Sequence, residues 1–190
     1  MQHQSSATIF LADGHRIFQT EDWRSISILR EQTAFKNLTA MRDETLAGGK
    51  SAVYHSTGFI ILIPIVGSII AETDSTETEI ACGELIIIDA GTALKVLNPY
   101  KEHLVNFILL YLDNNTFQNS GNSRYAFNLD DSKNELVDVF NKERVKLSLG
   151  KFEMRRETTC YSDQHHRSSF CFVIQGSFEI EGRLLHERML

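Results

Sequence analysis

Short runs of β-branched and aromatic residues, each bounded by glycine, asparagine or aspartate, constrain the fold of this chain more than any other feature. One run reads Asn-Phe-Ile-Leu-Leu-Tyr-Leu at 106–112 and is followed by Asp-Asn-Asn. Its short length and its aromatic residues near both ends favour a buried strand over a helix. Such runs predict strands at 25–30, 50–55, 59–66, 68–73, 84–88, 93–97 and 105–112. Many short strands with regular turns are typical of a β-sandwich or a small β-barrel.

The β pattern continues after a polar segment at 116–124, whose turn-forming residues predict a linker. Residues 131–141 fit a helix or a short strand at 136–140 equally well, and both alternatives stay open. Further strands are predicted at 145–152, 157–161, 170–175 and 177–181. A strand, a Gly-Ser turn and a second strand ending in Glu occur twice, at Gly67 and at Gly176. This repeat suggests two copies of one all-β unit.

Charge and composition exclude several classes of protein. Among the 190 residues, 19 are Lys or Arg and 25 are Asp or Glu, and the net charge of −6 without a basic block argues against direct binding of nucleic acid. The longest apolar run, 59–70, is interrupted by Pro64 and Gly67 and is too short to span a membrane. The N-terminus lacks the features of a secretory signal. Three scattered cysteines without a C-x-x-C motif favour a reducing, cytoplasmic location.

Gly83, Gly91 and Asn98 stand at the spacing G-x5-P-x-G-x2-H-x3-N, with Asp89 in the proline slot and Leu94 in the histidine slot. This spacing resembles the second motif of the cupins, which are double-stranded β-helix (jelly-roll) barrels. The first cupin motif, G-x5-H-x-H-x3,4-E-x6-G, fits when it is counted backwards from its last glycine at position 67. The resemblance implies an all-β cupin barrel.

The same alignment shows what has replaced the metal ligands. In metal-binding cupins, two histidines, a glutamate and a last histidine form the coordination sphere, and such a set suits iron, nickel, copper or manganese. The corresponding slots here hold Val53, His55, Ile60 and Leu94. One imidazole does not make a metal site, and branched apolar groups fill space. We therefore expect no bound cofactor and a barrel pocket at these four positions; a bound metal would be iron, nickel, copper, manganese or zinc.

A narrower resemblance rests on five segments. Asp-Trp-Arg-Ser at 22–25, Phe-Lys-Asn-Leu at 35–38 and Arg-Asp-Glu-Thr-Leu-Ala-Gly-Gly at 42–49 are similar to the opening of pirin-like proteins. Phe-Val-Ile-Gln-Gly-Ser-Phe-Glu at 172–179 and Gly-Arg-Leu-Leu at 182–185 are similar to their C-terminal cupin. Pirin-like proteins are two-domain cupins that include quercetin 2,3-dioxygenases. Pirin-like proteins carry the motif H-P-H and a later His-Ser-Glu around the metal. This chain has neither motif.

Pirin-like proteins also continue through several strands beyond the segment that matches 182–185, whereas this sequence ends at Leu190. We therefore expect an N-terminal cupin barrel at 1–115, a linker at 116–124, and an incomplete cupin-like domain at 125–190. An open barrel exposes unpaired strand edges. We expect a homodimer that covers the open second barrel.

Four further residues are weaker candidates for a pocket or a metal site. Asp163, His165 and His166 form a cluster in which two members occupy the histidine slots counted back from Gly176. The alternative is a polar surface loop, which the missing second motif favours. His103 follows Pro99 and is either an exposed turn residue or a residue near the barrel mouth.

Two functions compete on these observations. The first is a pirin-like cupin that has lost its metal site and acts as a non-catalytic module, binding a small apolar ligand or a protein. The second is a metal-dependent quercetin 2,3-dioxygenase-like oxidoreductase, as the resemblance implies. It needs a coordination sphere built from His55 with His103, or from the 163–166 cluster. Fold alone does not decide between them.

Overall fold

The computed structural model describes residues 8–29, 37–74, 76–89, 91, 93–117, 122–142, 145–159 and 169–189. Within these ranges the protein is all-β apart from the short 3-10 helix η1 (Ala12–Gly14). No helix of the described residues is long and apolar enough to cross a membrane.

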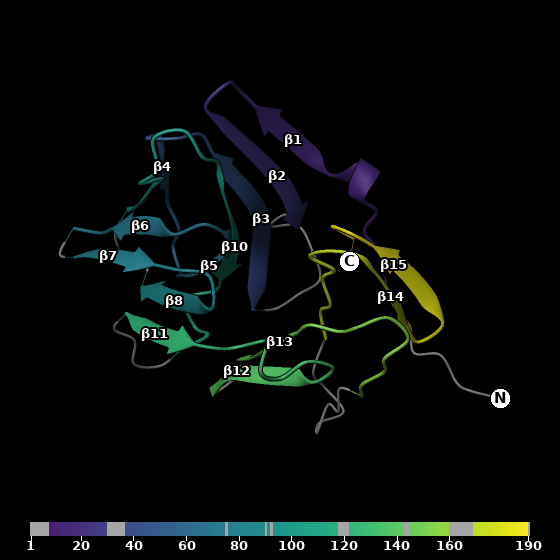
Figure 1. The fold of residues 1–190 in the computed structure, drawn as a ribbon. Coiled ribbons are helices and arrows are strands. Elements are labelled where there is room, and N and C mark those ends of the chain that lie inside the picture. Colours follow the sequence, from purple (N-terminus) through teal and green to yellow (C-terminus); the bar gives the residue numbers. More distant parts are fainter. Residues whose placement is uncertain are drawn as a thin grey trace.

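Two antiparallel sheets form the main body (Figure 1). The larger sheet has the order β1-β2-β3-β10-β5-β8-β11 and the smaller sheet the order β4-β9-β6-β7. The strands of the larger sheet are β1 (Arg16–Gln19), β2 (Trp23–Leu29), β3 (Leu38–Leu46), β10 (Val105–Leu112), β5 (Phe59–Val66), β8 (Glu84–Asp89) and β11 (Ser123–Ala126). Those of the smaller sheet are β4 (Ser51–Tyr54), β9 (Leu94–Leu97), β6 (Ile69–Glu72) and β7 (Glu77–Ile80).

A first apolar core lies between the two sheets. It is built from alternate residues, because successive side chains of a strand point to opposite faces. In β10, Phe107 and Leu109 point into this core and are fully buried. The smaller sheet contributes Ile69, Ala71, Leu94 and Val96, among others.

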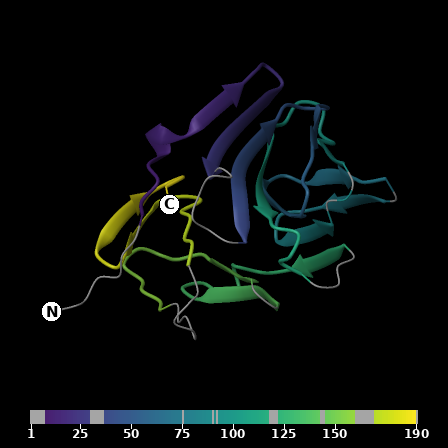
Figure 2. The ribbon, with the colours of Figure 1, turned by 180° about the vertical axis from the view of Figure 1, so that it is seen from behind.

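A second apolar core covers the opposite face of the larger sheet. The remaining residues of the same strands, such as Met41, Ile61 and Ile108, belong to it. They pack against the C-terminal part, which contains the hairpins β12–β13 (Leu136–Lys142, Val145–Gly150) and β14–β15 (Ser177–Ile180, Arg183–His186). Figures 1 and 2 both show β14–β15 on the side of β3 that faces away from β4, β6 and β7. Because both faces are buried, central strands such as β5 read as continuous apolar runs.

The structure confirms a strand at each of the seven positions predicted between residues 25 and 112. It adds β1, β3, β7, β11 and β15, and it resolves the ambiguity at 131–141 in favour of the strand β12. In β3 the consecutive charges of Arg42, Asp43 and Glu44 obscure the strand pattern. In β7 the residues preceding Ile80 are polar.

The predicted strand at 170–175 is wrong. The Val173 N–H donates to the Met189 carbonyl at 3.1 Å, and the Arg188 N–H donates to the Val173 carbonyl at 2.7 Å. The backbone thus bonds to a C-terminal turn in place of a strand ladder, while Phe170 and Phe172 pack on the second core. Of the predicted strand 157–161, residues 157–159 form no strand and the rest lies outside the described residues.

The region after residue 115 joins the larger sheet through β11, whose register pairs Ser123 with Ile87 and Arg124 with Ile86. Two residues of the predicted linker therefore belong to the barrel sheet. Among the described residues of the C-terminal part, the two hairpins form separate two-stranded sheets. The division into domains at 1–115, 116–124 and 125–190 stays a prediction.

Candidate functional site

The cupin-like ligand slots lie on β4, β5 and β9. Ile60 and Leu94 point between the sheets and are fully buried. Val53 points the other way, with 53% of its surface exposed. Tyr54 holds the inward position on β4, where it pairs with Leu94. Two of the four slots are thus filled by aliphatic side chains of the core, and a third faces solvent.

His55 follows β4 and lines a cavity of about 280 Å³ at one end of the barrel. Tyr111, which also lines the cavity, pairs across the sheet with Ile60, so the cavity adjoins one of the slots. Leu94 is not a lining residue. The complete lining comprises Thr39, Ala40, Arg42, His55, Ser56, Thr57, Tyr111, Leu112 and Asp113.

The other histidine candidates do not join this cavity in the described part of the chain. His103 is exposed, and its ring lies 6.2 Å from that of Tyr100. Its carbonyl accepts a hydrogen bond from the Asn98 side chain at 2.7 Å. Asp163, His165 and His166 lie outside the described residues.

The described residues at the slots do not fit a metal centre of the cupin type. Ile60 and Leu94 have no donor atom on their side chains, and the Val53 side chain has none either. Across the described ranges, no three residues of the types His, Cys, Asp and Glu come together in a way that would hold an ion. We therefore derive no chemical step through a metal.

A buried carboxylate lies in the barrel instead. Glu44 on β3 is fully buried and accepts hydrogen bonds from three neutral donors. Its Oε1 accepts from the Ser25 hydroxyl at 2.7 Å. Its Oε2 accepts from Trp23 Nε1 at 2.6 Å and from the Tyr54 hydroxyl at 3.2 Å. The cluster ties β2, β3 and β4 together.

Burial dominates the electrostatics of this cluster. It raises the pKa of Glu44 above the usual value, although the hydrogen bonds from Ser25 and Trp23 and the charge of Arg42 act in the opposite direction. Burial and the nearby Glu44 charge also raise the pKa of Tyr54 far above its ordinary value. Burial raises the pKa of Tyr111 to about 12. Both phenols therefore remain protonated hydrogen-bond donors at neutral pH.

Arg42 lines the cavity, and its charge also acts on Glu44 of this cluster. It lies two residues before Glu44 on β3, and alternation along a strand places both side chains on the same face. Its guanidinium carbon lies 5.4 Å from the centre of the Tyr111 ring, which is cation–π geometry. The cavity thus combines a cation, a phenol, an imidazole and three side-chain hydroxyls at Thr39, Ser56 and Thr57.

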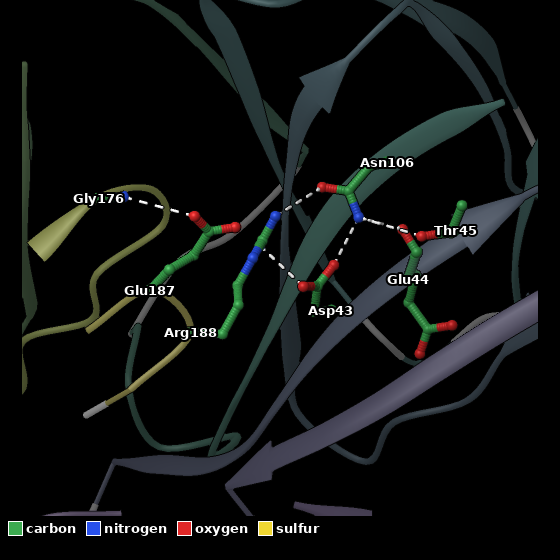
Figure 3. Close-up of polar contacts among 7 residues, drawn as sticks. All are labelled: Asp43, Glu44, Thr45, Asn106, Gly176, Glu187 and Arg188. Atoms are coloured by element: carbon green, nitrogen blue, oxygen red, sulfur yellow. Dashed lines mark hydrogen bonds and ion pairs between the residues drawn. The ribbon is translucent and has the colours of Figure 1, made fainter. Parts of the chain in front are cut away.

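Asp43, the residue between Arg42 and Glu44 on β3, takes part in a second polar cluster on the opposite face of the sheet (Figure 3). Asp43 pairs with Arg188 at 2.8 Å and accepts from the Asn106 amide. Arg188 in turn lies 3.4 Å from the Asn106 side-chain oxygen. Glu187 accepts from the Gly176 N–H at 3.5 Å. The contacts of Arg188 attach the C-terminal segment to β3 and β10, and the Glu187 bond lies within that segment, so the role of this cluster is structural.

Sequence reasoning missed Arg42, Glu44, Tyr54 and Tyr111 as site residues. A signal was present, because three consecutive charges at 42–44 interrupt a run that otherwise reads as a strand. In a strand buried on both faces, such charges require partners on both sides. The identity of those partners depends on strand pairing.

Comparison of the structure with solved proteins identifies the fold. No protein-family model matches the sequence, and no curated protein matches it. A bacterial pirin YhhW in complex with nickel(II) from Escherichia coli matches with a TM-score of 0.53 and 12% identity, over 64% of this chain and 58% of that chain. An oxalate decarboxylase from Bacillus subtilis, studied for its Mn(II) centres, matches with a TM-score of 0.50 and 17% identity, over 63% and 33%. This is a cupin fold.

The resemblance covers only part of these proteins, since the chain spans less than two thirds of the length of either. At such low identities the likeness concerns the fold alone. The function of this cupin therefore has to be argued from its own residues.

Proposed function

We propose that this cupin is a non-catalytic module that binds a small organic ligand in the cavity at its barrel mouth. The observation that carries the proposal is the cavity of about 280 Å³ beside Tyr111, next to a slot that Ile60 fills with an aliphatic side chain. Its size is near the lower limit of ordinary ligand sites. The ligand is accordingly smaller than most drug-like molecules.

The barrel chemistry supports binding over redox catalysis. Core packing of Ile60 and Leu94 occupies the space in which a coordination sphere would form. The Glu44 carboxylate is held by three neutral donors, which stabilise it without a metal. A binding module needs only a shaped and partly polar cavity, which this barrel has.

The competing function is that of a metal-dependent dioxygenase acting on a flavonol such as quercetin. Metal content of the untagged protein, measured by mass spectrometry after dialysis, separates the two functions. We expect well under one transition metal per chain, and no oxygen uptake with quercetin after loading with iron, nickel, copper or manganese. About one metal per chain with oxygen uptake would overturn the proposal.

Binding itself is tested by ligand-observed NMR with a panel of small neutral, cationic and anionic fragments. The variant Ala40→Leu adds bulk to the cavity wall, and we expect it to abolish binding of every fragment that occupies the site. Ala52→Leu is the matched control, because Ala52 packs at the edge of the first core without lining the cavity. If no fragment responds to Ala40→Leu while the variant remains folded, the cavity is not a binding site.

A further inference from the structure

Two donors in the cavity lack an acceptor within the described part of the protein. The Arg42 guanidinium contacts the Tyr111 ring but has no hydrogen bond or ion pair there. The Glu44 carboxylate, whose pKa the Arg42 charge lowers, is already bonded to three neutral donors. A guanidinium presents five N–H groups in a rigid fork, and at a partly buried site they need acceptors.

The second donor is the hydroxyl of Tyr111. The residue is only 7% exposed, and it lines the cavity. Its backbone carbonyl accepts from the Thr39 hydroxyl at 3.1 Å, yet its own hydroxyl has no partner among the described residues. Because this phenol stays protonated at neutral pH, it offers a proton to an acceptor in the cavity. The hydroxyl is not one of the fully buried unpaired atoms of the described residues, so it is open to the cavity, where a ligand acceptor can take the place of water.

Building on the proposed function, we infer that the cavity binds a small organic monocarboxylate, with Arg42 and Tyr111 donating to its two oxygens. A carboxylate is planar and matches the guanidinium fork, and charge-assisted bonds of this kind are about twice as strong as neutral ones. Ala40 and the His55 ring supply the less polar wall for the body of the ligand.

The rim of the cavity restricts the charge of the ligand to one. Asp113 contributes a carboxylate there, and its Oδ1 accepts from the Asn115 N–H and from the Asn115 amide, both at 2.8 Å. These bonds lower the pKa of Asp113, so it stays negative. A second anionic group on the ligand would face this charge, whereas a single carboxylate directed at Arg42 would not.

Benzoate and its neutral isostere benzamide are the first pair of probes, measured by NMR titration of the full chain at pH 7. We expect benzoate to bind and benzamide to bind at least tenfold more weakly. Arg42→Gln should weaken the binding of benzoate about tenfold to a hundredfold, and Tyr111→Phe should weaken it roughly threefold to tenfold. Arg24→Gln is the control, since it removes the same charge from an exposed position on β2 outside the cavity.

The outcomes separate this inference from the proposed function. If benzamide binds as well as benzoate, or if Arg42→Gln and Arg24→Gln behave alike, the cavity binds ligands but does not select carboxylates. If benzoate, salicylate, phenylacetate and butyrate all fail to bind up to about 10 mM while neutral fragments bind, the inference is also overturned. Should Arg42→Gln not fold, Arg42→Lys keeps the charge but loses the fork, and it should still weaken benzoate severalfold. If Arg42→Lys and Tyr111→Phe both bind benzoate as tightly as the unmodified protein does, the proposed donation from Arg42 and Tyr111 to the carboxylate is refuted.

Discussion

Replacing Glu44 by leucine tests whether the buried carboxylate cluster holds β2, β3 and β4 together. Leucine is similar in size, so the change removes the acceptor with little change in packing volume. The donors of Trp23, Ser25 and Tyr54 would then be left without their acceptor. A buried unpaired donor costs about 1–3 kcal/mol. Relief of the desolvation of a fully buried carboxylate offsets part of that loss.

The penalties for three such donors, less that relief, give an expected net loss of about 3–5 kcal/mol of the free energy of unfolding, which lowers the melting temperature by roughly 10 °C in a protein of this size. Urea denaturation followed by circular dichroism measures it. The fluorescence of Trp23, the single tryptophan, reports on the cluster itself. Glu77→Leu, at an exposed position of β7, should change stability by no more than about 0.5 kcal/mol.

The pH dependence gives an independent check. Since burial raises the pKa of Glu44 in the folded state, the folded protein binds this proton more tightly than the unfolded chain. The contribution of Glu44 is therefore fully present below its ordinary pKa of 4.5 and declines as the pH rises towards the raised value. The difference in stability between the unmodified protein and Glu44→Leu should be largest at the acidic end and shrink above it. A loss below about 1 kcal/mol at every pH would refute the reasoning.

Three further predictions concern the C-terminal segment, a tight backbone contact and the oligomeric state. Arg188→Met removes the ionic partner of Asp43, which is 4% exposed, and should cost about 2–4 kcal/mol in urea denaturation and speed amide exchange near the C-terminus. Gly58→Ala would push a methyl group into a backbone carbonyl of β10 and should cost about 2–4 kcal/mol, while Gly14→Ala, with open space around it, should be nearly neutral. We propose a homodimer that covers the incomplete second cupin-like domain, because among the described residues β12–β13 and β14–β15 are separate two-stranded sheets with open edges; light scattering showing only monomer at micromolar concentration would contradict it.

Much of the barrel follows from local sequence. The run at β10 is short, apolar and ended by Asp-Asn-Asn, so its strand is predictable without knowledge of its neighbours. The glycines of the repeat, Gly67 and Gly176, both adopt positive φ, of 77° and 85°, as turn glycines do. The spacing from Gly83 to Asn98 resembles the second cupin motif, this resemblance implied a cupin barrel, and the solved cupins confirm the fold.

Strand assignment was less successful where partners decide the outcome. The apolar residues at 170–175 have the composition of a strand, yet Val173 bonds to residues 188 and 189 near the C-terminus. Conversely, β3 carries Arg42, Asp43 and Glu44 and is nevertheless a central strand. A single sequence does not show which distant segment will satisfy a backbone or a charge.

The candidate site shows the same division. The sequence alone determined that ligand slots at 60 and 94 hold aliphatic side chains, because residue identity decides whether a donor atom is present. Only the tertiary structure decided that Tyr54 replaces Val53 at the inward position and that Arg42, His55 and Tyr111 share one cavity. These residues lie on different strands, and a shift of register by one residue would turn each side chain to the opposite face. The chemistry of each residue is encoded locally, but strand pairing across the whole barrel determines that these residues lie close together.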